Sequence, residues 1–313
     1  MDASSEYRGR IAPSPTGLLH IGHAMTFWHA QERAREAGGK LVLRIENLDR
    51  DRCRKEFADA IIEDLHWFGF DWDEGPDIGG PFAPYVQSER RRYYLEAWEK
   101  LRVGGFVYPC KCSRKDVMQA SLAPHDENEE SIYPGTCRPN SSSVEAAVPA
   151  ANPFLAADTS ASTTGTHWRF RVPDDERLEF IDECVGKQSA VAGRDFGDFI
   201  IWRRDAVPAY QLAVVVDDAA MQISEVVRGE DLLMSTFRQL LLYRALDLRS
   251  PKFYHAPLVL DESGKRLAKR HGALSLRALR ERGVSPEAAR TSGVNSRAKN
   301  RFTALARALL ALR

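Results

Sequence analysis

The sequence predicts an α/β fold built in layers, and three observations support this prediction. Residues 8–12 have the length of a short strand, and a Pro/Gly turn and a helical pattern over residues 20–37 follow them. Residues 40–46 form a nearly continuous apolar run, which is typical of a strand buried on both faces in a parallel sheet. Amphipathic helices are expected next, over residues 57–68 and 89–101. Strand followed by helix, twice in succession, is the order of an α/β layer fold.

The second half of the chain contains further strand and helix patterns. Strands are expected over residues 167–172, 199–203, 210–216 and 222–227. A helix is expected over residues 232–246, and a short amphipathic helix near the end would carry Phe302, Leu305, Leu309 and Leu312. Residues 140–166 are rich in Ser, Thr, Ala and Pro, so they predict a linker or a surface insertion.

Composition narrows the possible classes of protein. With 313 residues, the chain suits one large domain or two small ones. Lys and Arg number 44 and so do Asp and Glu, which disfavours a purely electrostatic nucleic-acid binder. No apolar run approaches the roughly 20 residues of a membrane span, and the first nine residues lack the apolar core of a secretory signal. Five cysteines, an odd count, disfavour a disulfide scaffold, so we expect a cytoplasmic protein.

The strongest motif is the string PSPTGLLHIGH, residues 13–23. His20 and His23 are three residues apart at the start of the expected helix, so they share one helix face. A helix start offers free N–H groups and the positive end of the helix dipole, both suited to phosphate. Gly22 would allow a ring or a phosphate to approach the backbone closely. The alternative interpretation is an ordinary helix start with two exposed histidines.

The second motif is the string DESGKRLAKRHG, residues 261–272. Its basic residues and glycines predict a cationic loop that could close over a triphosphate and neutralise the charge that develops during transfer. The alternative is a solvated, charged turn. Neither string has the Walker pattern G-x-x-x-x-G-K-[ST], so a P-loop hydrolase is disfavoured.

Together, the two strings resemble the signature pair of class I aminoacyl-tRNA synthetases. Residues 20–23 are similar to the HIGH motif of that family, and residues 266–270 to its KMSKR-type loop, with Arg266 and Ala268 as departures. Further strings resemble the glutamyl branch of the family: RIAPSPTG from Arg10, RIENLD from Arg44, PAYQLAVVVDD from Pro208 and VRGEDLL from Val227. Asn47 departs from the Asp that is more usual in this branch.

The resemblance implies a Rossmann-like parallel sheet in a catalytic domain, residues 7–280, with a zinc-binding connective insertion at 107–166 and a short tail at 281–313. Fewer than about 50 residues follow Arg270, which is less than a typical domain needs. No anticodon-binding domain is therefore expected. The chain then resembles the truncated glutamyl-queuosine group, which attaches glutamate to the queuosine base of tRNA(Asp). Implied partners are ATP with Mg²⁺, L-glutamate and queuosine-containing tRNA(Asp), and we expect a monomer.

The resemblance also implies roles for particular residues. Arg228 and Tyr210 would hold the side-chain carboxylate of glutamate, and Glu46 its ammonium group, since arginine forks bind carboxylates in bidentate fashion. Five neighbours would complete this site: Arg10, Ile11, Ala12, Pro13 and Ser14. ATP would be bound by Gly17, His20, Gly22, His23 and Lys269, of which His20, His23 and Lys269 would be catalytic. The alternatives are a strand-end ion pair for Glu46 and a half-buried strand aromatic for Tyr210.

A cluster of cysteines follows the first half of the chain. Zinc prefers four tetrahedral ligands, and the pattern of the resembled group supplies Cys110, Cys112, Tyr133 and Cys137. A phenolate is an uncommon ligand, so His125 is the competing fourth ligand, and three thiols without metal are the structural alternative. Three other functions stay open: charging a tRNA 3′ end, activating an amino acid for a carrier protein, and an inactive scaffold. An arginine pocket alone does not separate glutamate from aspartate.

Overall fold

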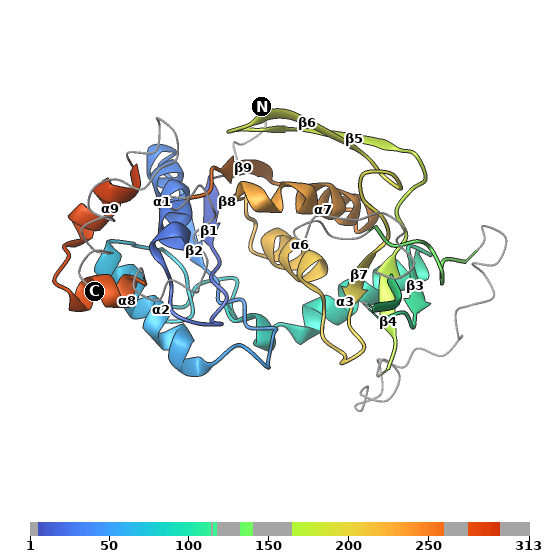
Figure 1. The fold of residues 1–313 in the computed structure, drawn as a ribbon, viewed down its shortest axis with the longest axis horizontal. Helices are drawn as coiled ribbons and strands as arrows, with labels where there is room; N and C mark the ends of the chain where they lie inside the picture. The colour runs from blue at the N-terminus through green and yellow to red at the C-terminus, as the bar shows by residue number, and fades with distance from the viewer. Residues whose placement is uncertain (1–5, 114, 118–131, 140–164, 260–274, 295–313) are drawn as a thin grey trace.

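The computed structural model describes residues 6–113, 115–117, 132–139, 165–259 and 275–294 (Figure 1). Four of the sequence predictions lie outside these residues: the cationic loop with Lys269, the competing ligand His125, most of the 140–166 segment and the terminal helix.

A parallel sheet forms the centre of the molecule, as predicted. Strand β1 (Arg8–Ile11) pairs in parallel with β2 (Lys40–Leu43), and β8 (Glu225–Gly229) pairs in parallel with β9 (Lys252–Ala256). The β1–β2 pair adjoins β8, because the Ser224 amide donates to the Arg8 carbonyl at 2.9 Å. On the other side of β9, strand β5 (Arg177–Asp182) is parallel to β9 at Asp182 and antiparallel to β6 (Gly186–Val191). The sequence patterns had not indicated β5, β6 or β9.

Hydrophobic cores cover both faces of this sheet. One core contains Leu41 and Leu43 and is covered by helices α1 (Ile21–Glu36) and α2 (Lys55–Phe68). The other contains Val42 and is covered by helices α3 (Arg91–Val103), α6 (Tyr210–Ala220) and α7 (Leu233–Ala245). Alternate residues of one strand therefore enter opposite cores, which confirms that this run is buried on both faces.

One element was predicted wrongly. Residues 210–216 form the first turns of α6 and not a strand. The three valines of this run favour strands, but all residues from Leu212 to Asp218 are buried, so the helix is enclosed on nearly every side. A short, continuously apolar run does not separate a buried strand from a buried helix.

A smaller antiparallel sheet lies at the right of Figure 1, in the order β3 (Val107–Cys110), β4 (His167–Phe170), β7 (Phe199–Trp202). It joins the main body through α3, whose Trp98 packs edge-on against Trp168 with ring centroids 5.0 Å apart. Two short 3₁₀ helices, Gln87–Glu89 and Glu230–Leu232, complete the connections between these elements.

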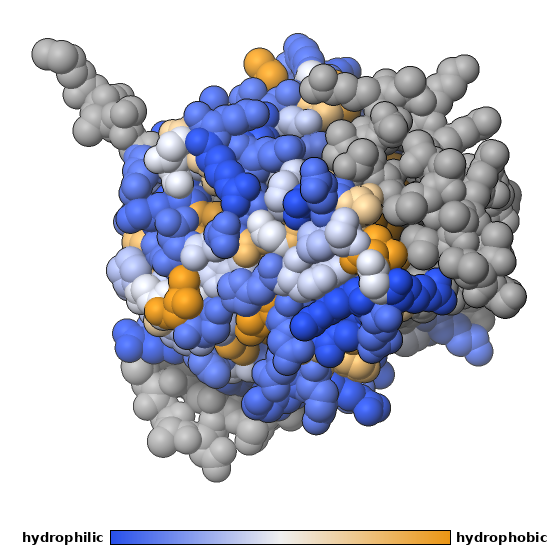
Figure 2. All heavy atoms as spheres, turned by 90° about the vertical axis from the view of Figure 1, so that its left-hand side faces the viewer, coloured by the Kyte–Doolittle hydropathy of each residue, from blue (hydrophilic) through white to orange (hydrophobic). Residues whose placement is uncertain are grey.

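The last described helices, α8 (Leu276–Glu281) and α9 (Pro286–Val294), lie beside α1 and α2 at the left of Figure 1. Arg277 donates to Asp64 of α2 at 2.8 Å, and the guanidinium of Arg290 lies 4.8 Å from the ring of Trp28. The coloured part of this face is mostly hydrophilic, with hydrophobic residues in small groups (Figure 2). Within the described ranges, no helix has the length and apolar character needed to cross a membrane.

Candidate functional site

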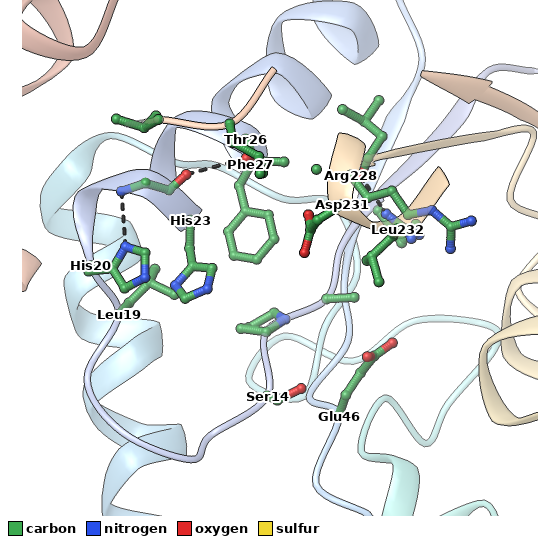
Figure 3. Close-up of a pocket in the computed structure, with 18 of the residues that line it drawn as sticks. Ser14, Leu19, His20, His23, Thr26, Phe27, Glu46, Arg228, Asp231 and Leu232 are labelled. Carbon is green, nitrogen blue, oxygen red and sulfur yellow. Dashed lines mark hydrogen bonds between the residues drawn. The ribbon is translucent and has the colours of Figure 1, made fainter. Parts of the chain in front are cut away.

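A cavity of about 380 Å³ lies where the start of α1 meets the carboxyl ends of β1 and β8. Ligands of open α/β sheets bind at this edge of the sheet. The predicted residues that line it are Arg10, Ala12, Pro13, Ser14, Gly17, His20, Gly22, His23, Glu46, Tyr210 and Arg228. Ile11 is the exception among the described residues, because its side chain is fully buried in the core beneath the cavity. His20 and Arg228 lie at opposite ends of the cavity (Figure 3).

The first end of the cavity is the N-terminus of α1. His20 is the N-cap, with extended backbone, and its Nδ1 accepts a hydrogen bond from the Gly22 amide at 3.1 Å. The neutral ring therefore carries its proton on Nε2, where it is a donor. The His20 and His23 rings stack with centroids 3.8 Å apart, as their three-residue spacing predicts. The helix start thus presents two adjacent imidazoles to the cavity (Figure 3).

Gly22 has a second structural reason beside the one expected. A Cβ at this position would lie 3.1 Å from both Cε1 and Nδ1 of His20. Glycine therefore leaves room for the capping imidazole, in addition to any room that it leaves for a ligand. Four lining residues lie outside the motifs found in the sequence: Thr26, Phe27, Leu258 and Val259.

Arg228, on β8, forms the opposite end of the cavity. Its Nε donates to Nε2 of His255 at 3.1 Å, and its Nη2 donates to Oγ1 of Thr236 at 2.7 Å. Both partners are neutral, and no carboxylate of the described residues forms an ion pair with Arg228. The residue is only 5% exposed. A buried positive charge without an anionic partner is costly, so this end of the cavity is suited to an anion.

His255 is itself held from behind by Asp182. Nδ1 of His255 lies 2.6 Å from the Asp182 carboxylate, which also accepts from the amides of Cys184 and Val185. Burial and the charge of Arg228 lower the pKa of His255, although Asp182 opposes this. Burial would raise the pKa of Asp182, but its backbone and His255 donors hold that pKa below its usual value. No sequence signal pointed to these two residues.

Glu46 is part of a buried ion-pair network. Its carboxylate accepts from Arg44 at 2.9 Å, and Arg44 also donates to Asp218 at 2.7 Å. Arg10 contributes to the same network, since its Nε lies 3.5 Å from Asp218. Burial raises the pKa of Glu46, while the Arg44 and Arg10 charges act in the opposite direction. The ion pair offered as the alternative for Glu46 is therefore present, and Glu46 nevertheless lines the cavity.

Tyr210 begins helix α6 and lines the cavity with a residue exposure of 38%. Its alternative interpretation, a half-buried strand aromatic, is wrong because the segment is helical. Helix α6 also provides Asp217, which accepts from Arg90 at 2.6 Å and from Gln87 at 2.8 Å. The network beneath the cavity therefore connects the buried helix α6 to β1, to the end of β2 and to the start of α3.

The cysteine cluster forms a separate site next to the small antiparallel sheet. The Sγ atoms of Cys110, Cys112 and Cys137 lie within 4.8 Å of one another. The Tyr133 hydroxyl lies 3.5 Å from Cys110 Sγ and 3.6 Å from Cys112 Sγ, so the four proposed ligands converge. Ligands of a tetrahedral zinc ion with bonds of about 2.3 Å stand about 3.8 Å apart, and this donor set fits that geometry.

The surroundings of the cluster favour ionisation of Cys137 but oppose ionisation of Tyr133. Burial opposes ionisation of Cys137, but hydrogen bonds from the Lys111 backbone and from Tyr133 lower its pKa to about 7. Burial and the contact with Cys110 raise the pKa of Tyr133, so its phenol would need a metal to ionise. Arg169 donates to Cys110 Sγ at 3.2 Å and lies 3.8 Å from the Tyr133 ring centroid. The sequence had not indicated this cation beside the ligands.

Comparison with known proteins decides the family. The model of the family "tRNA synthetases class I (E and Q), catalytic domain" matches residues 6–298. The chain belongs to this family. Its catalytic-domain fold also resembles a solved glutamate tRNA ligase from Elizabethkingia meningosepticum, with a TM-score of 0.69 and 30% identity. That similarity covers 86% of this chain and 53% of the ligase.

Among class I synthetases, two curated relatives share 48% identity with this chain. Both are named glutamyl-Q tRNA(Asp) synthetase, and they come from Symbiobacterium thermophilum and Nitratidesulfovibrio vulgaris. The first similarity covers 89% of this chain and 83% of the relative, and the second 88% and 82%. A glutamate–tRNA ligase from Sulfurihydrogenibium sp. is 38% identical, and the similarity covers 90% of this chain but 56% of that protein.

Proposed function

We propose that this class I synthetase activates L-glutamate with ATP and then transfers the glutamyl group to the queuosine base of tRNA(Asp). The observation that carries the first part is the buried Arg228, which has neutral partners and faces the cavity. A substrate carboxylate would supply the missing negative charge. The 48% identity to the two glutamyl-Q tRNA(Asp) synthetases, over most of both chains, supports the queuosine acceptor.

In the first step, the α-carboxylate of glutamate attacks the α-phosphorus of ATP in line, and pyrophosphate leaves. The protein contributes position and charge rather than a covalent bond. Arg228 and Tyr210 hold the side-chain carboxylate, and Glu46 takes the ammonium group, with Arg10 and Ser14 nearby. The Nε2–H of His20, together with His23, donates to the phosphate at the start of α1. Mg²⁺ enters as part of the ATP substrate, and Lys269 in the cationic loop remains a sequence prediction.

In the second step, a hydroxyl of the queuosine cyclopentene ring attacks the activated carbonyl carbon, and AMP leaves. The direct test uses labelled glutamate with tRNA from queuosine-containing and queuosine-deficient cells. We expect label only on the first tRNA, and we expect it to be lost when the anticodon loop is excised. Label on both tRNAs that is released with the 3′ terminus would instead identify a charging enzyme. ATP–pyrophosphate exchange without any tRNA label would indicate an activating enzyme for another acceptor.

We also propose that Cys110, Cys112, Tyr133 and Cys137 hold one structural zinc ion. Zinc would fix the loop around Tyr133 to β3, and Arg169 would offset the negative charge of the ligands. The test compares metal content and resistance to a chelator in the wild type and in Tyr133→Phe, which keeps the ring but removes the oxygen. We expect zinc retention to fall at least about tenfold. Unchanged retention would remove Tyr133 from the ligand set.

A further inference from the structure

A chain of hydrogen bonds connects the cavity to a buried carboxylate on another strand. It runs from Arg228 on β8 to His255 on β9 and to Asp182 at the end of β5. All three residues are at least 95% buried. Thr236 of α7 contacts both the Arg228 guanidinium and the His255 ring. Its Oγ1 lies 2.7 Å from Arg228 Nη2 and 3.1 Å from His255 Nε2.

The donors and acceptors fix where the proton of His255 lies. Nε of arginine is always a donor, so Nε2 of His255 must accept from it. The imidazole proton is therefore on Nδ1, where it donates to the Asp182 carboxylate 2.6 Å away. Asp182 keeps its orientation because its Oδ1 accepts from the amides of Cys184 and Val185 at 2.9 and 3.0 Å. One arrangement of protons satisfies all of these contacts.

This arrangement matters for the charge at the cavity. The imidazole stands between Asp182 and Arg228, so the carboxylate orients the ring without pairing directly with the arginine. Two of the three guanidinium nitrogens, Nε and Nη2, are held by neutral acceptors. Among the described residues, Nη1 makes no hydrogen bond. Arg228 is thus fixed in place while its positive charge stays available to a ligand.

We propose that Asp182 and His255 are positioning residues that orient Arg228 for the side-chain carboxylate of glutamate. The proposal rests on the proposed function, because it assigns Arg228 to that carboxylate. Asp182 selects the Nδ1–H tautomer, His255 supplies the neutral acceptor, and Arg228 contacts the substrate. Loss of either positioning residue should weaken the recognition of glutamate and leave the ATP end of the cavity unaffected.

The main test is Asp182→Asn, which is nearly isosteric. If its amide oxygen keeps the two backbone contacts, its NH₂ group faces His255 and donates to Nδ1. The ring proton then moves to Nε2 and points at the Nε–H of Arg228, so the hydrogen bond between the two residues is lost. We expect the KM for glutamate in ATP–pyrophosphate exchange to rise roughly tenfold to a hundredfold, since a hydrogen bond to a charged group is lost. The kcat and the KM for ATP should change less than about threefold on the same scale.

Two substitutions of His255 separate its two contacts. His255→Gln places an acceptor near the position of Nε2 and should retain most of the affinity for glutamate. His255→Asn can donate to Asp182 but does not reach Arg228, so its KM for glutamate should rise as in Asp182→Asn. The ¹⁵N chemical shifts of His255 give an independent readout, with the proton on Nδ1 in the wild type and on Nε2 in Asp182→Asn.

Asp195→Asn is the matched control, because Asp195 also caps a backbone amide, that of Val191 at 2.7 Å, but lies outside the cavity. It should leave the KM for glutamate unchanged. A folded Asp182→Asn protein with the KM of the wild type, or with the proton still on Nδ1, overturns this inference alone. If the wild type shows no glutamate-dependent exchange, the proposed function fails and the inference fails with it.

Discussion

The two ends of the cavity are built in different ways. At the α1 end, His20, Gly22 and His23 come from one turn of one helix, and the contact that fixes His20 is local. At the β8 end, Arg228 contacts His255, 27 residues away, and His255 in turn contacts Asp182, 73 residues away. The first end is a contiguous motif, whereas the second depends on correct assembly of the whole sheet. Substitutions at the two ends should therefore affect different kinetic constants.

The largest effect is expected from Arg228→Ala. It leaves a substrate carboxylate unpaired in a buried site, which costs about 3–5 kcal/mol, or roughly a thousandfold in kcat/KM for glutamate. The change should lie mainly in KM, as measured by ATP–pyrophosphate exchange. Arg244→Ala is the control, because Arg244 forms an exposed ion pair with Glu176 and should change kcat/KM less than about twofold. Wild-type KM in Arg228→Ala would show that the carboxylate binds elsewhere.

His20→Ala should have the next largest effect. It should lower kcat, whereas Arg228→Ala raises the KM for glutamate. One donor to the transition-state phosphate is worth about a hundredfold in rate. The KM for glutamate should stay near the wild-type value, because Arg228 and its partners are untouched. His29→Ala on the same helix, where His29 is half-exposed beside Glu32, is the control. If glutamate affinity fell in parallel with kcat, the two ends would not be independent.

Gly22→Ala should reduce kcat by about tenfold, less than loss of the whole donor. Its Cβ would lie 3.1 Å from the His20 ring and would displace it from the helix cap. The double variant Gly22→Ala with His20→Ala tests directly whether the added methyl group acts by displacing the His20 ring. If Gly22 acts only by making room for that ring, the methyl group should cost almost nothing once the ring is absent. An additive loss would instead indicate that Gly22 makes room for the ligand itself.

The same contrast explains what the sequence could predict. Residues 13–23 contain the turn, the cap and both imidazoles, so a local pattern was enough to locate the α1 end. The ion pair of Glu46 with Arg44 was open to prediction, because the two residues are two apart, whereas the contact of Arg44 with Asp218, 174 residues away, and that of Arg228 with His255 were not. Pairing such residues requires the order of the strands, and β5 and β9 were not indicated by periodicity. The valines of α6 misled the prediction for the same reason: burial by distant elements decided the conformation.

The smallest effect concerns pH and tests the β8 end by stability rather than by activity. Burial lowers the pKa of His255 in the folded protein, whereas in the unfolded chain it titrates near its ordinary value of about 6.5. Below that pH the unfolded state binds a proton that the folded state does not, so stability falls as the pH decreases toward the lower folded pKa. The slope from this one residue is at most about 1.4 kcal/mol per pH unit. Asp182, whose pKa is also lowered, adds its own loss only at more acidic pH, below its ordinary value.

Urea unfolding between about pH 7 and pH 5 in the wild type and in His255→Gln measures this slope. All other histidines are common to both proteins, so the difference between the two slopes belongs to His255. We expect the wild type to lose more stability on acidification than the variant. Equal slopes would mean that His255 accepts a proton in the folded state as readily as in the unfolded chain. Such a ring would be protonated below about pH 6.5 and could not accept from Arg228 there, so the support of Arg228 at the β8 end would hold only at higher pH.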